Sequence, residues 1–551
     1  MAAETNSGAD AKPQSQATIV AASAIGTVFE WYDFFIFGTL ASIISKHFFS
    51  GLPDAVGFLV ALLLFGVGFG MRPVGALVFG PIGDVLGRKR AFLVTVTLMG
   101  AATFLIGLLP TSEQVGGLAP ILLLVLRCIQ GFALGGEYGG AAIYVAEHAP
   151  QNRRGANTSW IQTSASIGLV TALLVILATR TILGEAAFSA WGWRVPFLLS
   201  AGLLIVSVWI RMQLEESPTF KKMKEEGKQS KAPLAESFLK WESLKLVLLS
   251  LFAIVIAQGV VWYTAHFYLQ FYLERIVKLP GPTVNWLMIG VVTCSAPLYL
   301  FFAWISDRTG RKPIMLGGIL AAAIAFFPGF QAMTRAANPL LWDAMQRAPV
   351  VVSADPAHCS IQFDPIGKTI YNSSCDIAKA ALSNSGVSYT SKDALGQLAS
   401  VRVGEAVVHS VSGKGMDAPQ LAAARKKFET ELRAALDGAG YPASADPAKA
   451  NMPVVFAIML LFAAAATALY GPQAAALAEL FPARIRYTAL SLPYHIGTGW
   501  FGGFLPAIAF ALVVGTGNIF NGLWYPLIGA TMSAIVMFFF LPETKGRDIS
   551  A

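Results

Sequence analysis

The sequence predicts an all-α membrane protein in which twelve transmembrane helices form two six-helix pseudo-repeats. The first observation behind this fold class is composition, because 55% of the 551 residues are hydrophobic and only 13% are charged, against about 25% in soluble domains. The second is that the apolar residues form runs of about 20, the length of a helix that crosses a bilayer. A membrane β-barrel is excluded because these runs lack the alternation of apolar and polar residues that barrel strands require.

The apolar runs place the helices in chain order at about 18–45, 55–79, 91–110, 119–143, 157–181, 193–213, 246–274, 284–305, 313–333, 452–476, 488–513 and 522–541. Basic residues gather in the loops after even-numbered helices, such as 87–90 and 308–312. Cytoplasmic loops carry this excess, so we expect both termini in the cytoplasm, and the net charge of +8 does not indicate a nucleic-acid partner. Residues 1–17 lack the apolar core of a signal peptide and are expected to be a disordered cytoplasmic tail.

An internal repeat is the third observation behind the fold class. "GDVLGRK" at 83–89 matches "SDRTGRK" at 306–312, which is 223 residues later. "AEHAPQNRRG" at 146–155 matches "AELFPARIRY" at 478–487, which is 332 residues later, so the second half holds about 109 additional residues. Parallel six-helix repeats with a substrate site between them are a transporter architecture.

The additional residues fall in a polar segment between helices nine and ten, on the non-cytoplasmic side. "PVVVSAD" and "GKTIYN" predict strands, and "CDIAKAALSNSG" and "PQLAAARKKFETELRAALDGAG" predict helices that end at glycine. We therefore expect a small α+β subdomain, with a disordered loop as the alternative. The expected boundaries are a tail at 1–17, a six-helix bundle at 18–213, a cytoplasmic linker at 214–245, helices seven to nine at 246–334, the insert at 335–451, helices ten to twelve at 452–541 and a tail at 542–551.

Ionisable residues inside the predicted helices are candidates for function, because each is costly in a bilayer unless it has a partner. Helix one carries Glu30 and Asp33, and helix four carries Arg127, Gln130 and Glu137. Counting about 1.5 Å per residue places Asp33 and Arg127 at similar depths, which predicts an ion pair between them. A purely structural pair is the alternative. Glu30 and Glu137 are the further candidates for carrying a proton.

Other polar residues in the helices could line a substrate cavity. Histidine can relay protons near neutral pH, although a lone histidine in a helix is more often a simple polar contact. The candidates are Gln258, Tyr263, His266, Tyr268, Gln270, Tyr494 and His495.

Four cysteines occur in the chain. Cys128 and Cys294 lie in predicted helices and are expected to be buried and inert. Cys359 and Cys375 both lie in the insert, where an oxidising compartment would favour a disulfide; two free thiols are the alternative. The sequence has no zinc-ligand spacing, no phosphate-binding loop and no nucleophile motif, so neither a cofactor nor an enzyme activity is expected.

The motifs resemble those of the major facilitator superfamily across all twelve helices. "GPIGDVLGRKR" and "AWISDRTGRKP" are similar to its loop motif and the echo of that motif, and "LEESPTF" and "LPETKGR" to its half-ending motifs. "FEWYDFFIFG", "RCIQGFALGGEYGGA" and "SLPYHIGTGWFGG" resemble the metabolite:proton symporter family, which includes transporters of oxo-acids, shikimate, citrate and proline or betaine.

The resemblance implies roles for the loop residues, which would hold neighbouring helix ends together while the transporter faces outward. Asp84 would be the latch, Asp307 its counterpart, and Glu147 with Arg154 and Glu479 with Arg486 would complete the charge clusters. The alternative is that the basic residues only set topology. The residues implied are Asp84, Gly87, Arg88, Lys89, Glu147, Arg154, Asp307, Arg311, Lys312, Glu479 and Arg486.

The sequence therefore predicts a secondary active transporter in a bacterial cytoplasmic membrane, with the proton as coupling ion. An organic anion is the favoured substrate, because Arg127 could bind a carboxylate. The alternatives are a zwitterion or osmolyte carrier and a transporter-like sensor whose insert binds a partner. We expect a monomer that contacts only its substrate, the bilayer and any partner of the insert.

Overall fold

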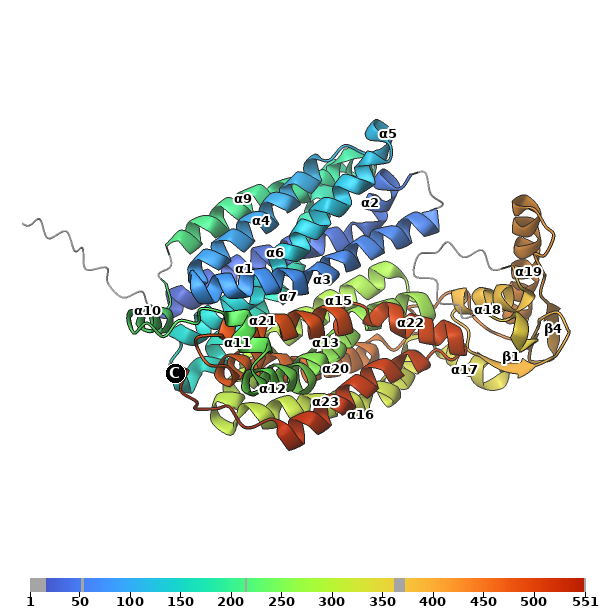
Figure 1. Ribbon diagram of the computed structural model, residues 1–551. Helices are drawn as coiled ribbons and strands as arrows, with labels where there is room; N and C mark the ends of the chain where they lie inside the picture. The colour runs from blue at the N-terminus through green and yellow to red at the C-terminus, as the bar shows by residue number, and fades with distance from the viewer. Residues whose placement is uncertain (1–15, 51–53, 214–215, 361–371, 550–551) are drawn as a thin grey trace, which may run out of the picture.

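The computed structural model describes residues 16–50, 54–213, 216–360 and 372–549. Long helices lie side by side in one bundle, and a small domain with a sheet projects from one end of it (Figure 1). We call the end of the bundle that carries the C-terminus the terminal end, and the end that carries the insert the insert end. Of the predicted N-terminal tail, residues 1–15 lie outside the described residues.

The first half of the bundle follows the predicted order of helices, with one additional break. The predicted helix at 18–45 is interrupted at Leu40, so two helices replace it. The helices of this half are α1 (Gln16–Thr39), α2 (Ala41–Phe48), α3 (Asp54–Val85), α4 (Arg88–Leu108), α5 (Ser112–Val115), α6 (Leu118–His148), η1 (Gln151–Arg153), α7 (Arg154–Leu183), α8 (Glu185–Ala187), η2 (Phe188–Gly192) and α9 (Arg194–Met212). The linker that follows forms α10 (Pro218–Glu225) and α11 (Pro233–Phe238).

The second half contains two long helices that change between α-helical and π-helical geometry. The seventh span is built from α12 (Trp241–Leu249), η3 (Ser250–Val255), α13 (Ile256–Tyr263), η4 (Thr264–Tyr268), α14 (Leu269–Phe271) and η5 (Tyr272–Ile276), and the eleventh from α21 (Arg486–His495), η7 (Ile496–Gly502) and α22 (Leu505–Thr516). The other helices are α15 (Gly281–Thr309), α16 (Arg311–Ala337), α20 (Met452–Leu480), η8 (Asn521–Leu523) and α23 (Trp524–Phe540). Such π-helical segments occur frequently at functional sites.

Among the described residues, eleven helical spans are long and apolar enough to cross a membrane. The 32-residue helix α3 is the remaining long helix of the first half and completes the predicted set of twelve. Large apolar side chains cover the outside of the bundle, with Ile182, Ile324 and Phe539 each at least 70% exposed. Apolar exposure on this scale has its natural explanation in contact with lipid.

The insert folds around a hydrophobic core of its own, separate from that of the bundle. Its four-stranded sheet has the order β2-β1-β3-β4, with β1 and β2 parallel and the other neighbours antiparallel. The elements are α17 (Pro339–Arg347), β1 (Val350–Ala354), η6 (Pro356–His358), α18 (Ser374–Asn384), β2 (Tyr389–Asp393), β3 (Ser400–Val403), β4 (Ala406–His409) and α19 (Ala418–Gly438). This confirms the predicted α+β insert and the strand in "PVVVSAD", whereas "GKTIYN" falls almost wholly outside the described residues.

A disulfide joins Cys359 to Cys375, as the two insert cysteines predicted. It ties the segment after β1 to the first turn of α18, whose Asp376 also accepts a hydrogen bond from the Ser360 backbone N–H at 2.9 Å. The expectation for the other two cysteines is wrong, because Cys128 is partly exposed and Cys294 is exposed.

The insert contacts the second half of the bundle at the ends of two transmembrane spans. The Tyr389 backbone N–H donates to the Gly517 carbonyl at 2.7 Å, just after α22. The Lys278 ammonium group donates to the Asn384 carbonyl at 2.6 Å, just after η5. The insert therefore holds the insert-end termini of the seventh and eleventh spans.

Candidate functional site: the transport pathway

Two aspartates at the terminal end each cap a helix of the opposite half. Asp84 in α3 accepts hydrogen bonds from the Tyr487 and Thr488 backbone N–H groups at 3.2 and 2.9 Å, at the start of α21. Asp307 in α15 accepts from the Gly155 N–H at 2.8 Å, and from the next amide at the same distance, at the start of α7. The first N–H groups of a helix lack partners and form the positive end of its dipole, so a carboxylate is the fitting cap. The two contacts are related by the internal repeat.

Two glutamates are each held between an arginine of their own half and one of the other half. The N–O distances are 2.8 Å for Glu147–Arg486, 3.7 Å for Glu147–Arg88, 2.9 Å for Glu479–Arg154 and 3.2 Å for Glu479–Arg311. The resemblance implied that Glu147 with Arg154 and Glu479 with Arg486 complete the charge clusters. All four residues lie in such clusters, but each glutamate contacts the arginine of the other half's motif rather than that of its own. The crossing arises because the end of α6 meets the start of α21, and the end of α20 meets the start of α7.

Two further glutamates from the half-ending motifs were not singled out from the sequence. Glu216 accepts hydrogen bonds from the Arg88 and Lys89 backbone N–H groups at 3.1 and 3.3 Å, which caps α4. Glu543 caps α16 in the same way, accepting from the Arg311 N–H at 2.9 Å and from the next N–H at 3.1 Å. The sequence does contain a pattern that could have identified them, because "LEESPTF" and "LPETKGR" each have a glutamate followed directly by serine or threonine.

Glycine is required before each of these capped helices. Gly87 and Gly310 have φ of +111° and +113°, where a residue with a Cβ is strained. A Cβ at Gly87 would also collide with the Glu216 carboxylate, and one at Gly310 with that of Glu543. The adjacent Lys89 and Lys312 donate to the Met212 and Phe538 carbonyls, each at 2.8 Å, at the ends of α9 and α23.

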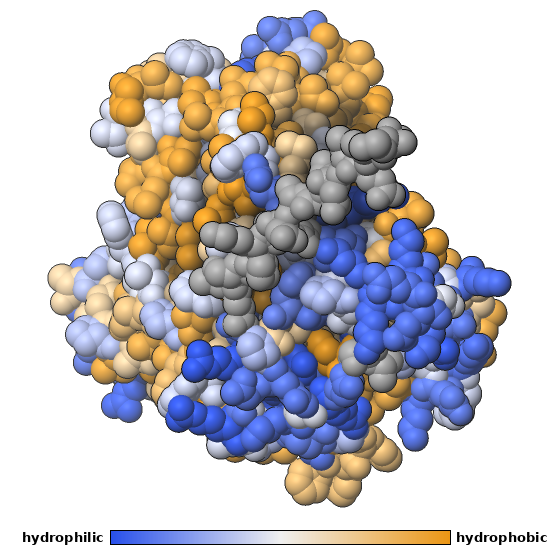
Figure 2. All heavy atoms as spheres, turned by 90° about the vertical axis from the view of Figure 1, so that its left-hand side faces the viewer, coloured by the Kyte–Doolittle hydropathy of each residue, from blue (hydrophilic) through white to orange (hydrophobic). Residues whose placement is uncertain are grey.

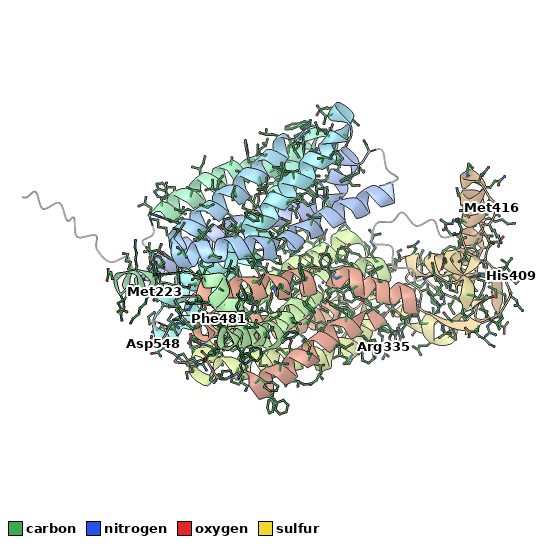
Figure 3. The ribbon with its side chains drawn as sticks, viewed as in Figure 1. Met223, Arg335, His409, Met416, Phe481 and Asp548 are labelled. Carbon is green, nitrogen blue, oxygen red and sulfur yellow. A yellow bond between two sulfur atoms is a disulfide. The ribbon has the colours of Figure 1, made fainter. Side chains whose placement is uncertain are left out.

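We call these contacts the closing network: those of Asp84, Asp307, Glu147 and Glu479 join the two halves at the terminal end, and those of Glu216 and Glu543 cap a helix within each half. Its residues are Asp84, Arg88, Glu147, Arg154, Glu216, Asp307, Arg311, Glu479, Arg486 and Glu543. Phe481 and Asp548 lie at this end of the bundle (Figure 3), and hydrophilic residues gather on much of its face (Figure 2). The side chains of Asp84, Glu147 and Glu479 are fully buried, so the halves are closed against each other here.

Glu30 in α1 pairs with Arg211 in α9, a residue that the sequence reading did not single out. Arg211 also lies 3.6 Å from Glu137 in α6, and its guanidinium lies 3.9 Å from the centre of the Phe92 ring. All three charged side chains are buried, and neither Glu137 oxygen accepts a hydrogen bond from a described residue. One buried cation therefore faces two buried carboxylates, and we call these three residues the acid cluster.

The predicted ion pair between Asp33 and Arg127 is absent from the ion pairs of the described residues. Arg127 instead donates to the Gln130 side-chain oxygen at 2.8 Å, and Gln130 donates to the Thr103 hydroxyl at 2.8 Å. Thr103 lies against Asp33, which in turn faces Glu30. Arg127 and Asp33 are therefore linked indirectly, through one amide and one hydroxyl. The depth estimate alone did not predict the side-chain directions.

Arg72 in α3 is a second buried arginine that sequence analysis did not single out. Its guanidinium lies 4.4 Å from the centre of the Phe69 ring and 4.8 Å from that of Phe34. Tyr263 of the second half lies within hydrogen-bonding reach of it. Its Nε and Nη2 atoms make no hydrogen bond to a described residue. Arg72 thus presents unused donors where the two halves meet.

Tyrosines from both halves pack against one another beside Arg72. Tyr138 of α6 stacks on Tyr494 of α21 with ring centres 3.6 Å apart, and it accepts a hydrogen bond from Gln162 at 3.0 Å. Tyr494 and Tyr470 share a hydrogen bond of 2.8 Å between their hydroxyls. This layer provides hydroxyl groups and flat apolar faces at the contact between the halves.

The other candidate cavity residues divide between this layer and the packing around it. His495 packs edge-on against Tyr494, and Tyr263 against Phe69. His266 stacks on Trp262 and bonds to the Trp262 carbonyl at 2.9 Å, which is the simple polar contact considered for it. The other three are held elsewhere. Gln258 is buried in α13, Tyr268 packs against Phe330, and Gln270 bonds to Glu274 near the insert end.

The described residues contain no group of three or more histidine, cysteine, aspartate or glutamate side chains that could hold a metal. The fold and these contacts define a class: a membrane protein of two repeated halves, with polar groups enclosed between them and a closing network at one end. That is the architecture of a secondary transporter.

The chain belongs to the family described as "Sugar (and other) transporter", which matches residues 18–245, 219–347 and 436–551. The unmatched residues 348–435 fall within the insert. The predicted membership of the major facilitator superfamily is confirmed, and the relatives found are transporters rather than enzymes.

Curated relatives differ in the substrates that their names state. The shikimate transporter of Escherichia coli (strain K12) is 36% identical over 326 residues, which cover 58% of this chain and 73% of that protein. The glycine betaine/proline/ectoine/pipecolic acid transporter OusA of Dickeya dadantii is 34% identical, covering 61% of this chain and 68% of that protein. The proline/betaine transporter of Escherichia coli (strain K12) is 36% identical over 56% of this chain and 63% of that protein.

Among solved structures, the proton:xylose symporter XylE bound to 6-bromo-6-deoxy-D-glucose is similar with a TM-score of 0.61. The two sequences are 16% identical, and the alignment covers 97% of this chain and 98% of XylE. This likeness supports the twelve-helix fold.

Proposed function

We propose that this transporter carries a small organic anion into the cell together with protons. The single observation that carries the proposal is Arg72, whose guanidinium is buried between the halves with two nitrogens unused. Arginine binds carboxylates through two parallel N–H donors, and buried guanidinium nitrogens that have no acceptor are costly. A substrate carboxylate would supply the acceptor, and the tyrosine layer would contact the rest of the molecule.

The acid cluster supports the proton as coupling ion. With Glu30 and Glu137 both ionised, Arg211 leaves one uncompensated negative charge in an apolar environment. Asp33 lies beside Glu30 and, when ionised, adds a second uncompensated negative charge. Repulsion between buried carboxylates favours binding a proton, so this cluster is where a transported proton would reside.

The chain of side chains from Arg127 through Gln130 and Thr103 to Asp33 offers a route for coupling. A substrate anion that draws Arg127 toward itself would break its bond to Gln130 and disturb the Thr103 contact with Asp33. Asp33 would then favour its neutral form, so substrate and proton would load together.

The proposal places the terminal end in the cytoplasm, the insert outside, and the protein in the cytoplasmic membrane of a bacterium. It is supported by the basic loops, which lie at the terminal end. Alternating access then requires the closing network to break when the substrate is released inward. One chain supplies both halves of the pathway, so a monomer is sufficient.

The test uses purified protein in liposomes with a proton gradient. A thermal-shift screen of organic acids, including shikimate, first selects the substrate, and uptake is then measured. We expect accumulation that collapses when a protonophore dissipates the gradient, and binding that is lost in Arg72→Gln. Uptake that is indifferent to the gradient would overturn proton coupling, and undiminished binding by Arg72→Gln would overturn the anion site.

A zwitterion such as a betaine is the second candidate, because the tyrosine layer could hold a quaternary ammonium group while Arg72 holds the carboxylate. The relatives whose names include betaine support it. The variant Tyr138→Leu distinguishes the two candidates. It should no longer bind a betaine, whereas it should bind a carboxylate anion without an ammonium group nearly as well as wild type does.

A further inference from the structure

A cleft of about 620 Å³ lies at the insert end, on the side of the second half away from the first. Its walls are the last turns of α16, the start of α17, and the start of α20. Figure 3 places Arg335, one of the residues lining it, where the bundle meets the insert. The cleft is outside the transport pathway described above.

One face of α16 continues from the lipid-exposed surface into this cleft. Leu320 and Ile324 are 44% and 75% exposed on the outside of the bundle. Residues four, seven and eleven positions after Ile324 lie on the same face of a helix, and these are Pro328, Gln331 and Arg335, all of which line the cleft. At about 1.5 Å per residue, Arg335 lies roughly 16 Å from Ile324, which is about half the hydrocarbon thickness of a bilayer.

The wall of the cleft formed by α20 also continues into an exposed apolar surface. Val454 of α20 lines the cleft and is 40% exposed, and Leu461, two turns further along the same face, is 51% exposed. The cleft is therefore continuous with exposed apolar faces of α16 and α20. Ile324 lies near the middle of α16, which places Arg335 at the level of the headgroups.

The cleft is positively charged. Arg335 and Lys449 both line it, and no carboxylate is among the described residues that do. The nearby Asp446 carboxylate accepts the Ala448 backbone N–H at 3.0 Å. Trp342 of α17 lies in the wall, where tryptophan suits the boundary between headgroups and acyl chains.

We propose that this cleft binds an anionic phospholipid, with its phosphate between Arg335 and Lys449 and an acyl chain along the Leu320–Ile324 face of α16. Charge selects an anionic headgroup, and the exposed apolar face of α16 distinguishes a lipid from a free phosphate. Trp342 and Lys449 belong to the additional segment between helices nine and ten, so the insert completes this site.

The experiment is native mass spectrometry of the full chain, equilibrated with equal amounts of phosphatidylglycerol and phosphatidylcholine in detergent. We expect wild type to retain phosphatidylglycerol preferentially. The double variant Arg335→Gln/Lys449→Gln should lose about thirtyfold of that retention, because each basic residue near an anionic headgroup contributes roughly fivefold. Both residues are exposed, so the variant should fold.

A matched control is Lys392→Gln/Lys414→Gln, which removes the same charge from exposed positions elsewhere on the insert. It should retain phosphatidylglycerol as wild type does. Equal loss in both double variants, or no loss in the first, would overturn the site. Glycerol 3-phosphate in excess, which carries the phosphate without acyl chains, should not displace the lipid; displacement would assign the cleft to a free phosphate instead.

Discussion

Arg211 makes it possible for Glu30 and Glu137 to be buried together. Removing one partner of a buried ion pair leaves an uncompensated charge, at a cost of about 3–5 kcal/mol. Arg211→Gln should therefore lower stability by about that amount, visible as a lower melting temperature in detergent. The measurement is a double-mutant cycle with Glu30→Gln, in which the double variant recovers at least half of the loss. Strictly additive losses would show that Arg211 contributes through packing against Phe92 instead.

Asp33 should couple the proton to the substrate without being needed for substrate exchange. Asp33→Asn keeps the size and polarity of the side chain and removes its charge, so counterflow should stay within about twofold of wild type while uphill accumulation is lost. Paired counterflow and gradient-driven uptake in liposomes measure both. Thr103→Val, which removes the hydroxyl beside Asp33, is expected to weaken accumulation only in part. If Asp33→Asn accumulates substrate normally, Glu30 or Glu137 becomes the coupling acid.

The sequence was a good guide to which helices carry buried charge and a poor guide to the partners. Depth along a helix follows from counting residues, and that count predicted a direct contact between Asp33 and Arg127. The direction of a side chain depends on packing, and Gln130, one turn away, is the nearer acceptor for Arg127. Arg211 was not selected because an arginine in the last turn of a helix is indistinguishable from one that only sets topology.

The insert contains a carboxylate whose protonation should affect its stability. Asp355 accepts backbone N–H groups of Ala357 and Gly396 at 3.0 and 2.9 Å, and these bonds lower its pKa. A lowered pKa in the folded state means that the stabilisation is complete above the unfolded value of about 3.9 and is lost as the pH falls further. Wild type should exceed Asp355→Ala in insert stability at pH 7, and the difference should shrink below about pH 4. A pH-independent difference in melting temperature would contradict this.

The bundle should still fold when the insert is removed, but the loop after α22 should become less protected. Its core is distinct, so replacing residues 340–448 by a short linker should leave a monodisperse bundle. The loop after α22 then loses its partners, because the Ile519 N–H donates to Ser388 at 3.2 Å and the Gly517 carbonyl accepts from Tyr389. Hydrogen exchange in residues 516–523 should accelerate. Absence of folded protein in detergent would refute separability, and unchanged exchange would show that the contacts do not restrain this loop.

The long helices could be predicted because apolar runs of this length have one solution in a bilayer. Short elements were harder to predict from the sequence than the long helices. Gly38 lies two residues before the break at Leu40, but an isolated glycine within an apolar run does not by itself predict an interruption, and β2, "YTSKD", is too polar to resemble a strand. This edge strand is stabilised by parallel pairing with β1, which lies inside the sheet. That pairing is a tertiary contact that the local sequence does not contain.

The internal repeat explains why the closing network has two equivalent parts. Asp84 and Asp307 stand at matching positions, and each caps the helix that begins at the other half's matching position. Neither half can therefore move without breaking bonds at both sites. The same relation holds for Glu147 and Glu479.

Weakening either cap should open the terminal end to a similar extent. Asp84→Asn and Asp307→Asn each remove charge-assisted hydrogen bonds worth about 1.5–3 kcal/mol, which corresponds to roughly a tenfold or greater shift toward the open state. The measurement is maleimide labelling of a cysteine at Ser491, which is buried against Gly139 between the halves, in a background lacking Cys128 and Cys294. Both variants should label faster by about that factor.

The matched control is Glu226→Gln, which removes one negative charge from an exposed pair with Lys228 in the linker between the halves. It should label as wild type does. If it accelerated labelling as much as Asp84→Asn, the effect would come from net charge rather than from capping. If only one of the two aspartate substitutions accelerated labelling, the two caps would not contribute equally to keeping the terminal end closed, although the repeat makes them equivalent in structure. Equal effects, with a larger one in the double variant, would mean that transport proceeds by both halves releasing each other at once.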